Sequence, residues 1–210
     1  MIYEWYEYKN EKSRYDGTWK KYIAWETDEN GDPFRVSGTL KTYIDETRKK
    51  WIIPEGVARL SANCFIDEAN DIFDNKASEI TLPASLTVIE ADAFAFCNLT
   101  KITVAPGNQN FTVKDNGLYT IDGKRIILSF PKNYGELFTI AEGTELIDAN
   151  AFMEIALNGS PIRIPSSVSA IGEGELELRD VPYIIAEKGS FAEEFAKKNG
   201  VEVRYQKFLQ

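Results

Sequence analysis

Apolar residues recur along this chain at one fixed spacing, counted from a proline or alanine that follows a short apolar run. From Pro83, apolar residues follow after three, six and eleven positions. The same spacing starts at Pro54, at Pro165 and, with a threonine at its first step, at Ala141. The residues at the eleventh position are Phe65, Phe94, Phe152 and Leu176. This period predicts a stacked-repeat fold, and we expect the three phenylalanines to be buried in one column.

The repeats fall near residues 51–79, 80–104, 138–161 and 162–186, with an irregular interval between the second and the third. Equivalent positions lie 22 residues apart from Pro83 to Ala105 but 36 apart from Ala105 to Ala141. In that interval two apolar runs, 111–121 and 124–131, flank an Asp-Gly pair, which favours a hairpin turn. We therefore expect a hairpin insertion over 106–135 that stands out from the stack.

The first repeat differs from the others at both of its ends. Before it, residues 34–44 and 51–54 are two apolar runs, which we interpret as a hairpin that delivers the chain into the stack. Within it, the stretch 66–79 is rich in acids, namely Asp67, Glu68, Asp71 and Asp74. Their spacing does not match an EF-hand loop, and no glycine lies at the centre. A solvated acidic loop therefore fits better than a calcium site.

Residues 1–33 form a separate aromatic segment. Three of the four tryptophans lie here, and aromatic residues alternate with charged ones around Trp5. Alternation of this kind indicates a strand, and Trp19 to Trp25 reads as a second one. The segment is interpreted as a cap over the first repeat, because an open stack needs its apolar end covered. The alternative is an aromatic platform for a sugar or peptide.

The C-terminal part carries the signals of a helix over 190–199. Ser190 can cap the first turn while Glu193 closes a capping box, and Gly200 can adopt the left-handed conformation that ends a helix. Phe191 and Phe195 fall on one face, which should lie on the last coil. Residues 201–205 then read as a short closing strand.

Composition restricts the function. The chain holds 24 basic and 33 acidic residues, a formal charge of −9, and residues 1–50 are neutral, so the excess lies in 51–210. This charge argues against a nucleic-acid partner, whose phosphates need a basic face, and no apolar run is long enough for membrane insertion. The N-terminal sequence does not resemble a signal peptide. We expect a cytoplasmic protein if Met1 is the native start, or a secreted or cell-surface one if a leader was removed.

The residues suited to catalysis or metal binding are few. The chain has no histidine, which excludes serine–histidine and cysteine–histidine nucleophilic pairs. Cys64 and Cys97 are too few for a disulfide framework or a zinc site, and we expect two free, buried thiols. The sequence therefore predicts a protein that is not an enzyme and needs no cofactor or metal.

The repeats resemble the BspA-like leucine-rich repeats of bacteria. The match is carried by residues 80–89, Ala93-Phe94, Cys97 and 99–104, and the 111–131 hairpin and the 189–200 ending also resemble that family. The resemblance covers about residues 34–205. It implies a mainly β, right-handed leucine-rich-repeat solenoid with a minor helical part. Departures from the pattern are Ala141 and Thr144 for the usual proline and valine, and 174–176 for Ala-Phe.

The domains expected are therefore an N-terminal aromatic cap or extension, 1–33, and a repeat domain, 34–210. The resemblance implies a role in protein binding or surface adhesion. Strand side chains alternate, so Ile80, Leu82, Ile102, Val104, Ile162 and Ile164 should point inward. The outward candidates for a contact strip are Glu79, Thr81, Lys101, Thr103, Thr139 and Arg163.

We expect these outward residues to bind an unidentified protein or peptide partner. One alternative is that they are ordinary solvated strand positions. Another is adhesion or carbohydrate binding by the aromatic N-terminal segment. Glycan hydrolysis is the least favoured function, because it needs two carboxylates across a cleft.

Overall fold

The fold is a mainly β solenoid, seen in a computed structural model. The structure describes the backbone of strands 5–8, 21–26 and 38–45, and in full residues 49–53, 55–65, 78–95, 97, 99–130, 133–152, 159–172, 178 and 181–205. The predicted loop at 66–77, Leu176 and the aromatic side chains of 1–33 lie outside this description. The chain divides into two compact units, residues 1–110 and 111–210, each described by itself below.

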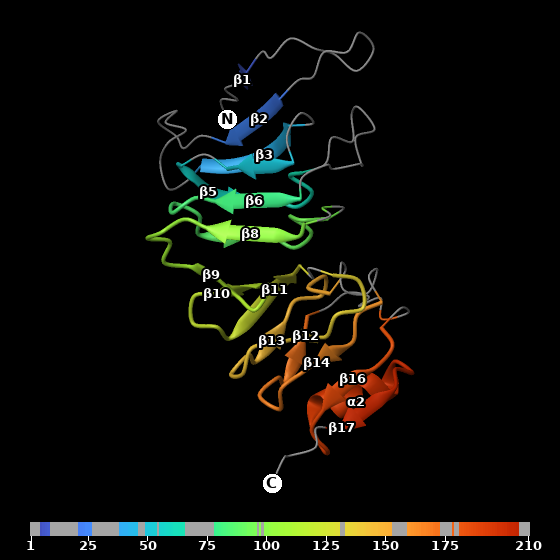
Figure 1. Cartoon of the computed structure of the whole chain (residues 1–210). Coiled ribbons are helices and arrows are strands. Elements are labelled where there is room, and N and C mark those ends of the chain that lie inside the picture. The colour runs from blue at the N-terminus through green and yellow to red at the C-terminus, as the bar shows by residue number, and fades with distance from the viewer. Residues whose placement is uncertain are drawn as a thin grey trace. The chain divides into compact units, whose positions relative to one another are not determined.

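The first unit contains two sheets, and successive coils add one strand to each (Figure 1). The parallel three-stranded sheet has the order β4 (Lys50–Ile52), β6 (Glu79–Leu82), β8 (Lys101–Val104). The other has the order β1 (Trp5–Tyr8), β2 (Lys21–Glu26), β3 (Gly38–Asp45), β5 (Val57–Leu60), β7 (Val88–Ile89). The predicted strands near Trp5 and Trp25 are therefore present.

The chain does not enter this unit through the predicted hairpin of 34–44 with 51–54. β3 pairs antiparallel with β2 and parallel with β5, whereas β4 pairs with β6. The two apolar runs thus belong to different sheets. The prediction was wrong because both sheets of a solenoid pair between coils, about one repeat apart in sequence.

Inward side chains of the first unit form columns from coil to coil. Trp51, Ile80 and Ile102 are aligned in register on β4, β6 and β8, and all three are buried. The rings of Phe65 and Phe94 are both buried and stack with their centroids 5.6 Å apart. Their predicted column is confirmed for these two residues.

Polar side chains at the turns bond to the backbone of the neighbouring coil. The Ser85 hydroxyl accepts from the Gly56 amide and donates to the Val57 carbonyl, at 2.9 Å each. The buried Asn108 amide donates to the carbonyls of Pro83 and Leu86, at 2.9 and 3.0 Å. These bonds satisfy backbone groups that the short strands leave unpaired, which explains polar residues inside an apolar stack.

The second unit repeats this arrangement with a helix at its end. Its parallel sheet has the order β12 (Phe138–Thr139), β14 (Ile162–Arg163), β16 (Ile184–Ala186), β17 (Val203–Tyr205). Its mixed sheet has the order β15 (Ala170–Ile171), β13 (Leu146–Ile147), β11 (Arg125–Ser129), β10 (Gly117–Thr120), β9 (Phe111–Lys114). The helix is α2 (Phe191–Lys198).

The predicted hairpin is present as β10 and β11, and β9 adds a third antiparallel strand. The sequence predicted that this hairpin would stand out from the stack, and that prediction was wrong. β11 pairs in parallel with β13, so the segment is part of the mixed sheet. The reason is apolar burial, because Tyr119 on β10 and Ile126 on β11 are fully enclosed in the core of this unit.

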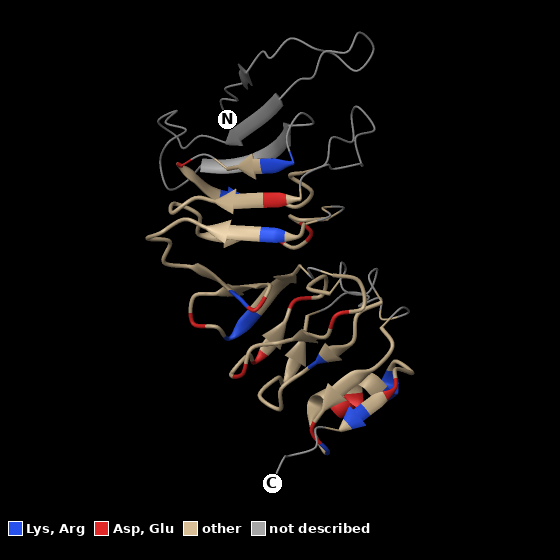
Figure 2. Ribbon diagram, viewed as in Figure 1, with Lys and Arg blue, Asp and Glu red and all other residues tan. Residues whose placement is uncertain are grey.

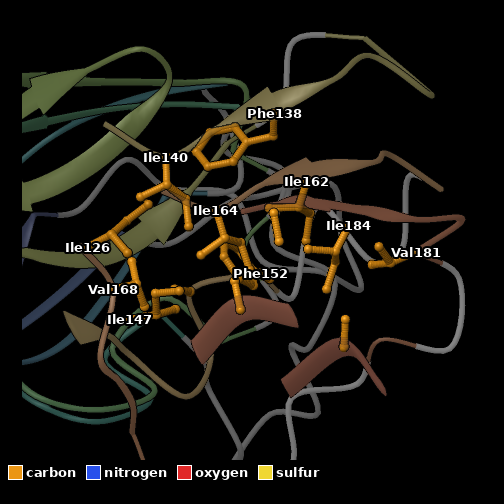
Figure 3. Close-up of a cluster of buried hydrophobic side chains, with 14 of the residues drawn as sticks. Ile126, Phe138, Ile140, Ile147, Phe152, Ile162, Ile164, Val168, Val181 and Ile184 are labelled. Carbon is orange, nitrogen blue, oxygen red and sulfur yellow. The ribbon is translucent and has the colours of Figure 1, made fainter. Parts of the chain in front are cut away.

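The core of the second unit lies between its two sheets (Figure 3). Phe138, Ile162 and Ile184 are aligned in register and buried, and the Phe138 and Phe152 rings meet edge to face with centroids 6.3 Å apart. Phe152 is buried as predicted. Of the six residues predicted to point inward, Val104 is half-buried and the other five are buried.

Two unusual residues of the third repeat are explained by one polar arrangement. Where other repeats carry proline, Ala141 has a free backbone N–H, which donates to the buried Tyr119 hydroxyl at 3.1 Å. Thr144, in place of valine, is buried and donates its hydroxyl to the Ala141 carbonyl at 2.8 Å. The repeat therefore keeps its shape with different chemistry.

The predicted C-terminal helix and closing strand are confirmed. The Ser190 hydroxyl accepts from the Glu193 amide at 3.3 Å, while the Glu193 carboxylate accepts from the Gly189 amide at 2.5 Å. Gly200 follows with φ +70°. Ala192 and Ala196 are fully buried on the core, and β17 pairs in parallel with β16.

Candidate functional site

The predicted contact strip is divided between the two units. Glu79 and Thr81 lie on β6, and Lys101 and Thr103 lie on β8, in the three-stranded sheet of the first unit. The other two residues, Thr139 and Arg163, lie on β12 and β14 of the second unit. The two groups belong to different sheets and are described in turn.

On the first unit, the outward side chains form two rows across β4, β6 and β8, which we call the β4–β6–β8 face. Parallel pairing aligns Lys50 with Glu79 and Glu79 with Lys101. The next outward row contains Ile52, Thr81 and Thr103, aligned in the same register. The inward columns between these rows are fixed by burial, so the outward rows are fixed as well.

Charge alternates along the first of these rows. The charged residues at the starts of β6 and β8 appear as red and blue segments in Figure 2. The Lys101 ammonium lies 3.7 Å from the Glu79 carboxylate, and their side chains are 60% and 38% exposed. An exposed pair at this distance contributes about 0–1 kcal/mol, so it does not lock either side chain.

Two residues of this face were missed by sequence reasoning. Lys50 and Ile52 lie in the two outward rows, and Ile52 is 57% exposed. They were overlooked because 51–54 was interpreted as one apolar arm of a hairpin. Aligning Trp51 with Ile80 would have identified both, since residues on either side of an inward position point outward.

On the second unit, the outward row runs across all four strands of the parallel sheet. Thr139 is aligned with Arg163, Arg163 with Ile185, and Ile185 with Arg204. The Arg163 guanidinium lies 3.5 Å from the Glu142 carboxylate. Arg204 lies over the Tyr183 ring, 3.5 Å from its centroid. This row presents two cations with an isoleucine between them.

Two groups with shifted pKa values lie in the cores of the units, away from both rows. Burial raises the pKa of the Cys64 thiol well above its usual value, and the neighbouring Cys97 raises it further. Burial also raises the pKa of Tyr119 to about 12, against the lowering effect of its bond from the Ala141 amide. Both groups are enclosed in a core, so their shifts indicate structural roles.

The described part of the chain has neither a cluster of metal ligands nor a membrane-spanning helix. Among the residues that the structure describes, no three histidine, cysteine, aspartate or glutamate side chains gather as metal ligands would. Within these limits, no helix has the length and apolar character needed to span a bilayer. Cys64 and Cys97 are both buried thiols that are not joined in a disulfide, as predicted.

The repeats match a known protein family. Residues 47–120 match the family model described as "BspA type Leucine rich repeat region", in six copies. A comparison with curated proteins gives no match. The matched segment includes the whole β4–β6–β8 face.

Solved structures of bacterial leucine-rich repeat proteins are also similar to this chain. A leucine-rich repeat protein from Eubacterium ventriosum is 18% identical with a TM-score of 0.47, and the match covers 66% of this chain and 42% of that one. A leucine rich cell surface protein from Faecalibacterium prausnitzii is 25% identical with a TM-score of 0.44, covering 59% and 37%. The chain thus corresponds to less than half the length of either protein.

Proposed function

Because residues 47–120 are BspA-type leucine-rich repeats, we propose that the chain is a non-catalytic module that binds a protein or peptide through its exposed strand faces. Repeats of this family generally serve as protein-interaction or surface modules. The observation that supports this function best is the register of the β4–β6–β8 face. It aligns two rows of outward side chains across three coils.

This alignment suits recognition of an extended ligand. Neighbouring strands lie about 4.8 Å apart, so a ligand that crosses them meets one outward side chain of each row per coil. Solenoids use such repetition to build extended binding surfaces. A single exposed isoleucine is ordinary on a protein surface, but Ile52 lies in line with Thr81 and Thr103, where a crossing ligand would contact all three.

Partner capture tests this proposal. The chain would be used as bait in extracts of its source cell, with bound proteins identified by mass spectrometry. Thr103→Trp places a bulky uncharged side chain on the β8 strand of the face, where it blocks a crossing ligand whatever its charge, and Gln109→Trp adds the same side chain at an exposed turn outside the face. We expect Thr103→Trp to abolish capture and Gln109→Trp to leave it unchanged.

Both variants should fold normally, because exposed substitutions usually change stability by about 0.5 kcal/mol or less. Equal capture by the wild type and a folded Thr103→Trp variant would contradict binding at this face.

The row on the second unit is proposed as a further contact area. Arg163→Glu reverses a charge in this row, and Lys188→Glu makes the same change at an exposed turn before α2. We expect only Arg163→Glu to weaken capture. Equal capture by these two variants would exclude the second unit's row from the binding surface.

A further inference from the structure

The start of the β4–β6–β8 face carries a surplus of positive charge on an acidic protein. Lys50 and Lys101 are both exposed here, and Glu79 is the acid aligned between them. The balance of this row is two cations against one anion, whereas the whole chain has a formal charge of −9. A local surplus opposed to the overall charge favours an anionic ligand at this place.

The cations of this face are available to a ligand. Among the described residues, Lys50 forms no ion pair, and Lys101 has only the long, exposed contact with Glu79 described above. Displacing that contact costs little, since pairs of this kind contribute about 0–1 kcal/mol. A carboxylate from a partner can therefore reach both lysines without breaking a strong interaction.

The geometry also provides an apolar contact beside the charges. Ile52 lies two residues along β4 from Lys50 on the same face, a distance of about 6.6 Å at the rise of a strand. Lys50 and Lys101 lie two strands apart, so about 9.6 Å separates their backbone positions. A ligand that fits this face carries two negative groups at that separation and an aliphatic group to one side.

We propose that the β4–β6–β8 face binds an acidic peptide segment of a partner protein. Its carboxylates pair with Lys50 and Lys101, and an aliphatic side chain covers Ile52. This inference rests on the proposed function, because it names the kind of protein segment that the same face takes. A long polyanion fits less well, because it extends beyond the screening length of about 8–10 Å and meets the net negative charge of the chain.

Fluorescence anisotropy with labelled peptides tests the proposal on the full chain. The first probe is a ten-residue peptide with four Glu and two Ile among Gly and Ser, and three analogues replace Glu by Gln, Glu by Lys or Ile by Ala. We expect the Glu/Ile peptide to bind, with an affinity that falls as salt is added. The Gln analogue should bind at least about tenfold more weakly, as for a lost charge pair, and the Lys analogue should not bind.

Matched variants assign the binding to this face. The double variant Lys50→Glu with Lys101→Glu should bind the Glu/Ile peptide at least about tenfold more weakly than the wild type does. Lys114→Glu with Lys188→Glu makes the same change of charge at exposed positions of the second unit and should have no effect. Ile52→Ser should weaken binding of the Glu/Ile peptide but not binding of the analogue with Ala in place of Ile. Only the Glu/Ile peptide has an aliphatic contact with Ile52 to lose.

Four results would overturn the proposal. The first is that the Glu/Ile peptide does not bind, and the second is that the Lys analogue binds as tightly as the Glu/Ile peptide. The third is an equal loss of affinity in the two lysine double variants. The fourth is tighter binding of heparin or duplex DNA that Ile52→Ser does not weaken. If peptide binding fails while Thr103→Trp still abolishes partner capture, the face binds a protein of different chemistry. If Thr103→Trp also leaves capture intact, the proposed function itself fails.

Discussion

Single residues show how the repeat tolerates departures from its pattern. Pro83 and Pro165 have no backbone N–H to satisfy, whereas Ala141 at the equivalent position has one and donates it to Tyr119. Tyr119 belongs to the hairpin insertion, so this insertion supplies the acceptor that is needed where Ala141 replaces the usual proline. A buried donor without a partner would otherwise cost about 1–3 kcal/mol.

This compensation can be measured by a double-mutant cycle. Tyr119→Phe should lower the free energy of unfolding by about 1–3 kcal/mol, because the Ala141 amide loses its acceptor. In an Ala141→Pro background, which removes that donor, the same substitution should cost clearly less. Denaturant unfolding of the four proteins gives the coupling energy, and an equal cost in both backgrounds would refute the role of Tyr119.

The two cysteines give a second prediction at this scale. Burial holds the pKa of Cys64 well above its usual value, and its thiol donates to the Ala93 carbonyl at 3.6 Å. Because the thiolate is the reactive form, we expect neither Cys64 nor Cys97 to react with a thiol reagent in the native state. Both should react after unfolding, and rapid native labelling would contradict their burial.

Among the elements, α2 depends on one carboxylate. Glu193 is buried and accepts from the Lys197 ammonium, the Gly189 amide and the Tyr205 hydroxyl. These interactions, with Lys197 the largest, lower the pKa of Glu193 from the ordinary 4.5 to about 2. The ionised form is therefore stabilised by folding, and the helix, its cap and β17 are joined through it.

The pH dependence of stability follows from the sign of this shift. A lowered pKa in the folded state contributes stability above pH about 4.5, and this contribution is lost as the pH falls toward about 2. The difference in stability between the wild type and Glu193→Gln should therefore shrink across this range. Unfolding monitored by circular dichroism at several pH values measures it. Parallel curves for the two proteins would show that Glu193 does not titrate as described.

The elements also show what could be predicted from sequence. The helix was found because a capping box and a terminal glycine are local signals that need no distant partner. The partners of β3 and β11 were missed, because pairing between coils depends on residues about one repeat away. Ile52 was missed for the same reason, as its outward position follows from alignment with Thr81. The cap formed by 1–33 stays a prediction, although β1 and β2 extend the sheet beside β3.

At the scale of the whole molecule, stability comes from stacking one coil on the next. In the first unit the Trp51, Phe65 and Phe94 rings form a continuous series, with successive centroids 5.6 Å apart. Phe94→Ala should cost about 3–5 kcal/mol, as for a large truncation in a core. Tryptophan fluorescence reports on this unit, because all four tryptophans lie within residues 1–51.

Ile52→Ala is the matched control for this truncation, because Ile52 lies in the same unit, is 57% exposed and should be replaced at little cost. An unfolding midpoint that Phe94→Ala leaves unchanged would disprove the alignment of the repeats.

The most direct test of the account is photocrosslinking from the β4–β6–β8 face. A benzophenone amino acid would replace Thr103 in one protein and Gln109, outside the face, in another. Each would be irradiated in an extract of the source cell, and the adducts would be identified by mass spectrometry. We predict that Thr103 forms a specific adduct, which Lys50→Glu with Lys101→Glu removes, and that Gln109 does not. The same adducts from both positions, or none from Thr103, would contradict binding at this face.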